Sequence, residues 1–184
     1  MNRFVIPFII SVSTLLVSCQ SLPMRVTLNR MIDSTIVLPD ELTCIRAGEV
    51  VPVPTTLALS PKLIVFIDST GCSSCRINDF VLYESLFAQA SETGQYSILL
   101  LLSVKKTMYE GIHSLLCNVK YPFPVYLDTE NSFLRSNPMI PKDPRYHVML
   151  IDIYNRIKMV GDPTTDAATM SLFNKTLNDI NVLL

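Results

Sequence analysis

Two cysteines three positions apart are the residues of this sequence best suited to chemistry. They stand in the segment Cys72-Ser73-Ser74-Cys75, directly after an apolar run at 62–67 that predicts a buried strand. The apolar spacing over 77–87 predicts a helix after the pair. The Cys72 sulfur is then expected near the unpaired N–H groups of a helix start, which favour the thiolate. This arrangement predicts thiol–disulfide exchange, in which Cys72 attacks and Cys75 resolves the mixed disulfide.

Two charged residues flank the pair. Arg76 supplies a positive charge that would stabilise the Cys72 thiolate, although a solvated surface arginine is the alternative interpretation. Asp68 follows the predicted strand and is a candidate to accept the proton of Cys75. A plain turn residue is an equally good interpretation of Asp68.

The elements that would position the pair alternate along the chain. Strands are predicted at 62–67, 97–103 and 124–127, and a hairpin at 148–152 and 156–160. Helices are predicted after the pair, with Gly94 as its stop, and near 108–116 and 170–180. The apolar positions expected on these helices are Ile77, Phe80, Val81, Tyr83, Phe87, Met108, Ile112, Leu115, Leu116, Met170, Phe173, Leu177 and Ile180. The order β-α-β-α-β-β-β-α predicts an α/β domain with helices on both faces of a mixed sheet.

The N-terminal residues 1–18 have the pattern of a signal peptide. Arg3 precedes an apolar stretch at 4–17 that is short for a membrane span. The stretch ends in Leu16-Val17-Ser18-Cys19, which resembles the lipobox of bacterial lipoproteins, and this resemblance implies a lipid on Cys19. An ordinary secretory signal, with Cys19 incidental, is the alternative.

Lipidation of Cys19 implies an anchored protein in an oxidising, extracytoplasmic compartment of the cell envelope. Gln20 stands where similar lipoproteins of the inner membrane carry an acid, which favours the outer membrane and a periplasm-facing domain. We expect a lipid-anchored tether and peripheral β segment at 19–55 and one domain at 56–184.

The strand, CxxC pair, helix and late hairpin together resemble thioredoxin-fold proteins over residues 56–184. With the lipobox, they look closest to thioredoxin-like envelope lipoproteins related to cytochrome-maturation and thiol-resolving proteins. The stretches 147–152 and 155–161 are similar to the ending of that family. The resemblance implies a thioredoxin-like fold with a β-rich N-terminal extension. It also implies a membrane-tethered thiol-disulfide oxidoreductase that uses no cofactor or metal, acts on envelope protein dithiols or disulfides and has an upstream electron donor or acceptor.

Three positions depart from the family pattern. The family places a proline, usually cis, six residues before Asp152, where this chain has Tyr146. Either Pro144 fills that role after a two-residue slip, or the proline is absent. Phe66 replaces a buried carboxylate, and Gly71 replaces the tryptophan that commonly precedes the pair. The surroundings of the pair therefore differ from those of an ordinary thioredoxin.

Two other functions compete with dithiol exchange. Cys72, Cys75 and His147 could together bind Cu(I), as in Sco-type copper chaperones, although those proteins space their cysteines CxxxC. The other is a redox-inactive adaptor that holds a partner at the membrane. A peroxidase is disfavoured because the PxxxTxxC pattern of peroxiredoxins is absent around Cys72.

Composition excludes other classes of function. The formal net charge is -1 and the basic residues are scattered, so the sequence shows no nucleic-acid surface. Cys44 and Cys117 stand among apolar residues and are predicted to be buried free thiols. His113 is expected on a helix surface.

Overall fold

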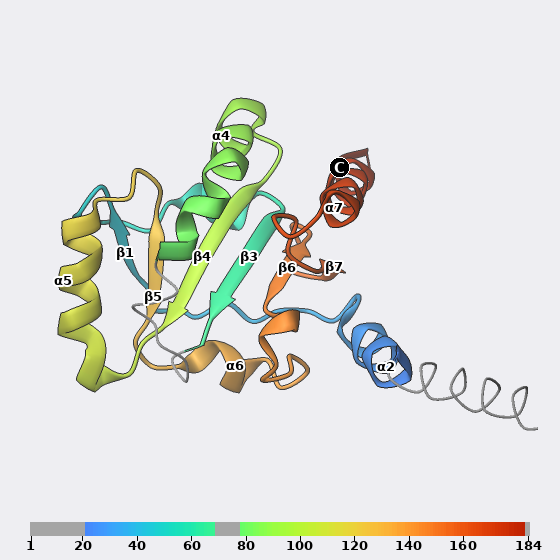
Figure 1. Cartoon of the computed structure of the whole chain (residues 1–184), viewed down its shortest axis with the longest axis horizontal. Helices are drawn as coiled ribbons and strands as arrows, with labels where there is room; N and C mark the ends of the chain where they lie inside the picture. Colours follow the sequence, from blue (N-terminus) through green and yellow to red (C-terminus); the bar gives the residue numbers. More distant parts are fainter. Residues whose placement is uncertain (1–20, 69–77, 183–184) are drawn as a thin grey trace, which may run out of the picture.

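A seven-stranded mixed sheet runs through the part of the chain that the computed structural model describes, residues 21–68 and 78–182. The strand order is β2-β1-β5-β4-β3-β6-β7, with β3, β4 and β5 parallel and the other neighbours antiparallel (Figure 1). The strands are β1 (Thr43–Arg46), β2 (Glu49–Val51), β3 (Lys62–Ile67), β4 (Ser97–Ser103), β5 (Val125–Asp128), β6 (Val148–Ile151) and β7 (Ile157–Val160).

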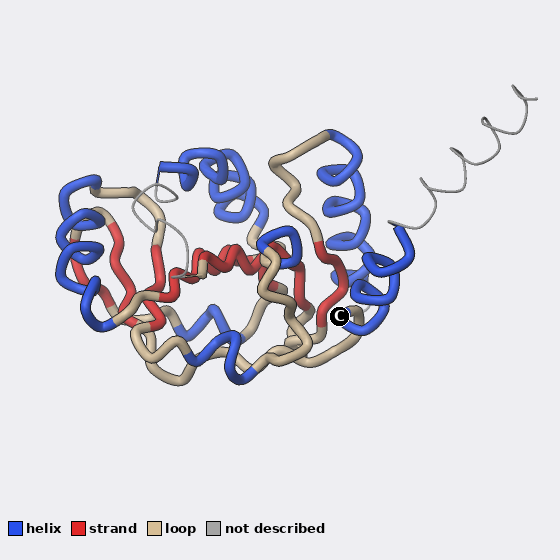
Figure 2. The backbone as a smooth tube through the Cα atoms, turned by 60° about the horizontal axis from the view of Figure 1, so that its bottom comes forward, coloured by secondary structure: helices blue, strands red, loops and turns tan. Residues whose placement is uncertain are grey.

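Helices cover both faces of this sheet, as the sequence predicts (Figure 2). The α-helices are α2 (Ser21–Met31), α4 (Glu84–Thr93), α5 (Tyr109–Val119), α6 (Ser132–Ser136) and α7 (Ala167–Val182). Short 3-10 helices are η1 (Thr55–Ala58), η2 (Asn78–Tyr83), η3 (Lys106–Met108) and η4 (Pro144–Tyr146).

Strand β3 divides the core into two layers. Its six residues are all buried, which confirms the prediction made from its continuous apolar run. Because successive side chains of a strand point to opposite faces, Leu63, Val65 and Ile67 pack with η2, α4, α5 and α7. Ile64 and Phe66 point the other way, toward α2, α6 and η4. The central strand is therefore held from both sides.

The sequence predicts the body of the domain well. All five strands and the β6–β7 hairpin are confirmed, and α5 and α7 bury the central part of each predicted apolar stripe. Gly94 ends α4 in a left-handed conformation, with φ of 64° and its N–H bonded to the Ala90 oxygen at 2.9 Å. Asp152 shapes the hairpin turn, since its Oδ1 accepts the N–H groups of Tyr154 and Arg156, both at 2.9 Å.

Some sequence expectations are wrong in detail. Val81 and Met108 are 52% and 40% exposed rather than on the buried stripes. The reason is that both lie in 3-10 helices, whose three-residue period moves positions off an α-helical stripe. The described part of the helix after the cysteine pair accordingly begins as η2 and becomes α-helical only at Glu84.

The segment before the domain is more structured than its composition indicates. The sequence does not predict helix α2, and Thr35 forms an isolated antiparallel bridge to Arg156. Strand β1 pairs with β5, and β2 forms one edge of the sheet. The expected peripheral β segment thus extends the sheet, and Met31 and Ile36 are fully buried beneath it.

No helix within residues 21–68 and 78–182 is both long and apolar enough to cross a membrane.

Lys62 is the one buried lysine among the described residues, and its side chain is fully enclosed at the start of β3. Its Nζ donates to the Ser60 carbonyl oxygen at 2.8 Å and to Asn155 Oδ1 at 3.4 Å. Burial lowers the pKa of Lys62, and the nearby Asp152 carboxylate opposes this only in part. The folded protein therefore binds the Lys62 proton less tightly than the unfolded chain does.

We predict that this group makes stability depend on pH. Stability should rise with pH between the lowered folded pKa and the unfolded value of about 10.4, with a slope of at most about 1.4 kcal/mol per pH unit. Urea unfolding of the native chain and of Lys62→Met, at several pH values from neutral to alkaline, measures this. As the pH rises, the free energy of unfolding of the native chain should increase relative to that of Lys62→Met. The exposed control Lys105→Met should show the same pH dependence as the native chain. Parallel pH curves for the native chain and Lys62→Met would contradict the prediction.

Candidate active site

The predicted redox pair belongs to the segment that joins β3 to η2. Cys72, Cys75 and Arg76 lie outside the described residues, as does Cys19. The structure does describe the residues on either side: Asp68, half-buried just beyond the end of β3, and the chain from Asn78 onward. The predicted order of strand, cysteine segment and helix is thus present, with a 3-10 helix as its first described helical part.

Two buried aromatic residues of η2 hold this helix, which follows the cysteine segment, against the rest of the domain. Phe80 is 1% exposed and packs edge-on against Tyr121, with ring centroids 5.8 Å apart. Tyr83 is buried, and its hydroxyl donates to Asp162 Oδ2 at 2.6 Å, which ties η2 to the loop between β7 and α7. Both ends of the cysteine segment are therefore attached to the packed domain.

Phe66 places an aromatic ring in the core layer on the α2 and α6 side of the sheet, near the end of β3. Its ring lies 4.8 Å from that of Phe133 and 5.0 Å from that of His147, centroid to centroid. Phe66 itself is 3% exposed. The position where the family carries a buried carboxylate is thus filled by a ring in van der Waals contact, so β3 supplies no buried acid there.

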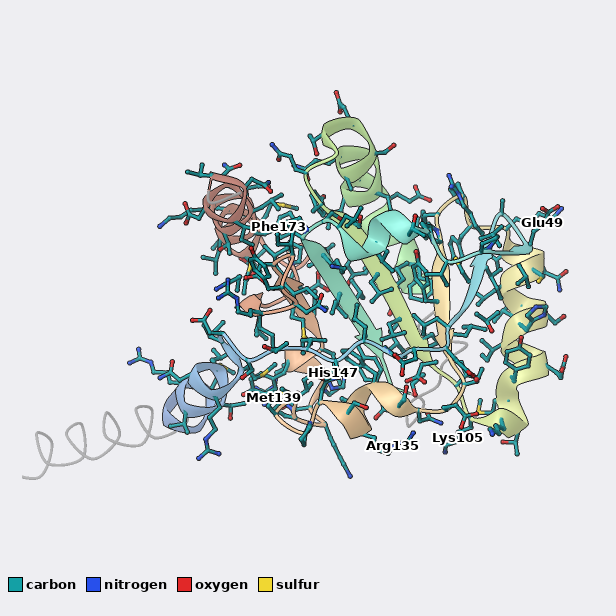
Figure 3. All side chains as sticks on the ribbon, turned by 180° about the vertical axis from the view of Figure 1, so that it is seen from behind. Glu49, Lys105, Arg135, Met139, His147 and Phe173 are labelled. Carbon is teal, nitrogen blue, oxygen red and sulfur yellow. The ribbon has the colours of Figure 1, made fainter. Side chains whose placement is uncertain are left out.

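The segment before β6 is fastened to the end of β3 (Figure 3). The Phe66 N–H donates to the His147 carbonyl oxygen at 3.0 Å, and the His147 N–H donates to the Pro144 oxygen at 3.0 Å. His147 is buried, and its Nε2 lies 2.9 Å from the Pro141 oxygen. Because a carbonyl oxygen can only accept, Nε2 is the donor of this hydrogen bond.

Pro144 opens the 3-10 turn η4 rather than a cis turn. The peptide bonds of the described residues are all trans, Pro144 included. Asp143 caps the turn by accepting the Arg145 N–H at 3.0 Å, and the adjacent guanidinium lowers the pKa of this exposed carboxyl. Tyr146, at the position of the family proline, is buried beneath the sheet. Pro144 therefore lies in η4, two residues before Tyr146.

The structure brings several of the predicted residues together. Asp68 extends from the end of β3, and Pro144, Tyr146 and His147 lie in the segment that enters the neighbouring strand β6. No group of three or more His, Cys, Asp or Glu side chains in the described ranges is arranged to hold a metal ion.

Two buried polar residues at the same edge were not predicted as part of the site. Ser103 ends β4 and pairs with Asp128, which ends β5, and the Ser103 hydroxyl donates to Asn131. Asp128 accepts the N–H groups of Ser132 and Phe133 at 3.0 and 2.9 Å and thereby caps α6. An acid at the end of a predicted strand with a serine four residues later, Asp128 and Ser132, is the signal that could have identified this cap. Because both oxygens of Asp128 accept cap hydrogen bonds, its role is structural.

Two cysteines lie among the described residues, and their surroundings differ. Cys44 on β1 is 1% exposed, which confirms it as a buried free thiol, and burial raises its pKa. Cys117 on α5 is only half-buried, and its Sγ lies 3.8 Å from Nδ1 of His113. His113 is therefore partly covered rather than simply on the surface.

Comparison with solved structures identifies the architecture. A crystal structure from Chlorobium tepidum, described as a thiol:disulfide interchange protein DsbE, superposes with a TM-score of 0.52 at 18% identity and covers 79% of this chain and 99% of that chain. The fold is thioredoxin-like. A thioredoxin-like protein from Porphyromonas gingivalis (TM-score 0.48, 20% identity, 80% and 95% coverage) also matches. So does the thioredoxin domain of a thiol-disulfide oxidoreductase from Bacteroides vulgatus (TM-score 0.48, 16% identity, 81% and 97% coverage).

No protein-family model matches the sequence, and no curated protein is significantly similar to it. The thioredoxin-like fold is thus recognised through its geometry, at 18% sequence identity.

We predict that the cysteines differ in reactivity in the native protein. With the chain reduced and folded at mildly alkaline pH, iodoacetamide should leave Cys44 unmodified, because its thiol is buried and its pKa is raised. Cys117 should be modified slowly, since it is half-buried. Peptide mass spectrometry after timed alkylation measures both, with denatured protein as the control in which all thiols react. Labelling of Cys44 as fast as Cys117 in the native state would contradict the assignment.

Proposed function

We propose that this chain is a lipid-anchored thiol-disulfide oxidoreductase of the bacterial envelope that works through Cys72 and Cys75. The observation that carries the proposal is the place of the pair in a thioredoxin-like fold. Strand β3 leads into the Cys72-Ser73-Ser74-Cys75 segment and η2 leads out of it. The similar structure from Chlorobium tepidum is described as a thiol:disulfide interchange protein, which supports the same chemistry here.

The proposed reaction moves two electrons from the reduced pair to a partner disulfide. The Cys72 thiolate attacks one sulfur of the partner disulfide, so that a mixed disulfide forms and the partner's other sulfur leaves as a thiolate. Cys75 loses its proton and attacks the Cys72 sulfur. The mixed disulfide breaks, the partner leaves with both sulfurs reduced, and Cys72 and Cys75 are joined. The same steps in reverse would oxidise a partner dithiol.

The lipid anchor is the second part of the proposal. It rests on the apolar stretch at 4–17 and the Leu16-Val17-Ser18-Cys19 motif at its end. The partners would be protein dithiols or disulfides of the envelope, together with a donor or acceptor that resets the pair.

The two cysteines should have separable roles. In glutathione buffers, the native chain should titrate as a two-electron couple with both Cys72 and Cys75 converted. Cys75→Ser should accumulate a mixed disulfide with glutathione, because the resolving thiol is missing, whereas Cys72→Ser should form none at position 75 on the same timescale. Quantification by acid quench, alkylation and mass spectrometry measures this, and Cys117→Ser is the matched control that should behave as native.

A cysteine pair without redox activity would support the redox-inactive adaptor instead. If the pair neither exchanges with glutathione nor titrates below about pH 8, the proposed oxidoreductase function is wrong.

Asp68 is proposed to accept the Cys75 proton during resolution. It is the acid at the end of β3, while Phe66 fills the position where the family has a carboxylate. Asp68→Asn should slow the decay of the mixed disulfide about a hundredfold at neutral pH, the low end of what proton transfer by a side chain contributes. The rate should recover at alkaline pH, where hydroxide removes the proton. Stopped-flow kinetics measure this, with Asp79→Asn on η2 as the control. A slow rate that does not recover at alkaline pH would mean that Asp68 is merely structural.

A further inference from the structure

Helix α2 turns two different faces to its surroundings. Leu28 and Met31 pack onto the core layer beneath the sheet, and Met31 is fully buried. The opposite face is exposed and consists of Arg25, Val26, Asn29 and Arg30, spaced as one side of an α-helix. We call these four residues the basic face of α2. Figure 1 shows α2 at one end of the molecule, beyond β7 and opposite α5.

The charge on this face is not neutralised locally. The sequence contains no Asp or Glu from residue 1 to residue 32. Within the described ranges, the ion pairs involve the lysines and arginines of other elements, and neither Arg25 nor Arg30 takes part in one. Val26, between the two arginines, is 49% exposed. The face therefore offers two cations around an apolar side chain.

The position of α2 in the sequence brings this face close to any lipid on Cys19. Ser21, the first residue of α2, follows Cys19 by two positions. At about 1.5 Å per residue, the 11 residues of α2 span about 16 Å, and the far end is fixed in the core by Met31. An anchored chain thus has a short, helical connection to the bilayer rather than a long flexible one.

We propose that the basic face of α2 lies against an anionic lipid bilayer. This inference rests on the proposed lipid anchor at Cys19 and adds a second contact to it. Arginines at an anionic surface each contribute about 1 kcal/mol, which corresponds to about fivefold in the contact equilibrium. The contact would hold the α2 end of the domain at the membrane and place α5 at the end that faces away (Figure 1).

A single introduced tryptophan can report on contact with the bilayer, because the sequence contains no tryptophan of its own. Val26→Trp therefore supplies a single indole on the basic face. Val119→Trp is the matched control on α5, since Val119 is exposed to a similar extent, 41%. The full-length chain is lipidated in a bacterial host and reconstituted into phosphatidylglycerol–phosphatidylcholine vesicles. Brominated lipids in the vesicles quench indoles that reach the interface.

We expect strong, salt-sensitive quenching of Val26→Trp and none of Val119→Trp. In the Val26→Trp background, Arg25→Gln and Arg30→Gln should each weaken the contact about fivefold, and vesicles of phosphatidylcholine alone should abolish most of it. Lys105→Gln, which removes a cation far from α2 (Figure 3), should change nothing.

Two outcomes would overturn the inference, and they are distinguishable. If the chain floats with the vesicles but Val26→Trp is quenched no more than Val119→Trp, the anchor stands and the α2 contact is wrong. If the lipidated chain cannot be obtained and the protein does not float, the anchor fails and the α2 contact with it. Glutathione titration of the same samples reports on dithiol exchange independently of both.

Discussion

Burial of strand β3 on both faces is the constraint on which the rest of the structure depends. Its side chains alternate between a layer made with η2, α4, α5 and α7 and a layer made with α2, α6 and η4. A one-residue slip in its pairing would exchange the two sets of side chains, so its register is strongly fixed. This register sets where β3 ends, and hence where the segment that carries Cys72 and Cys75 begins. It also brings the Phe66 N–H to the carbonyl oxygen of His147.

The parts of the fold that could be predicted are those in which local pattern and tertiary burial agree. Continuous apolar strands, a glycine helix stop and the turn at Asp152 all have strong local causes. Helix α2 was missed because its sequence alternates charged, polar and apolar residues without a clear stripe, and its order comes from the docking of Leu28 and Met31. The exposure of Val81 was missed because a 3-10 helix has a different period from an α-helix.

The sequence proposes residues for the candidate site but does not give the contacts around them. The pattern of the chain is enough to propose Cys72 and Cys75 and to place His147 at the start of a neighbouring strand. It does not reveal that the His147 ring is held between Phe66 and the Pro141 oxygen, because both contacts depend on how separate segments pack. The described layer at the end of β3 therefore consists of the rings of Phe66, Phe133 and His147.

The two edges of the sheet bear on how copies of this chain behave at high local concentration. Strand β2 is three residues long and is followed by Pro52 and Pro54, which cannot donate backbone hydrogen bonds. On the other edge, β7 is approached by Thr35 through a bridge to Arg156, and α2 packs beside it. Exposed strand edges are the usual templates for intermolecular β-pairing. With one edge short and the other partly covered, copies at high local concentration have few free strand positions through which to join their sheets.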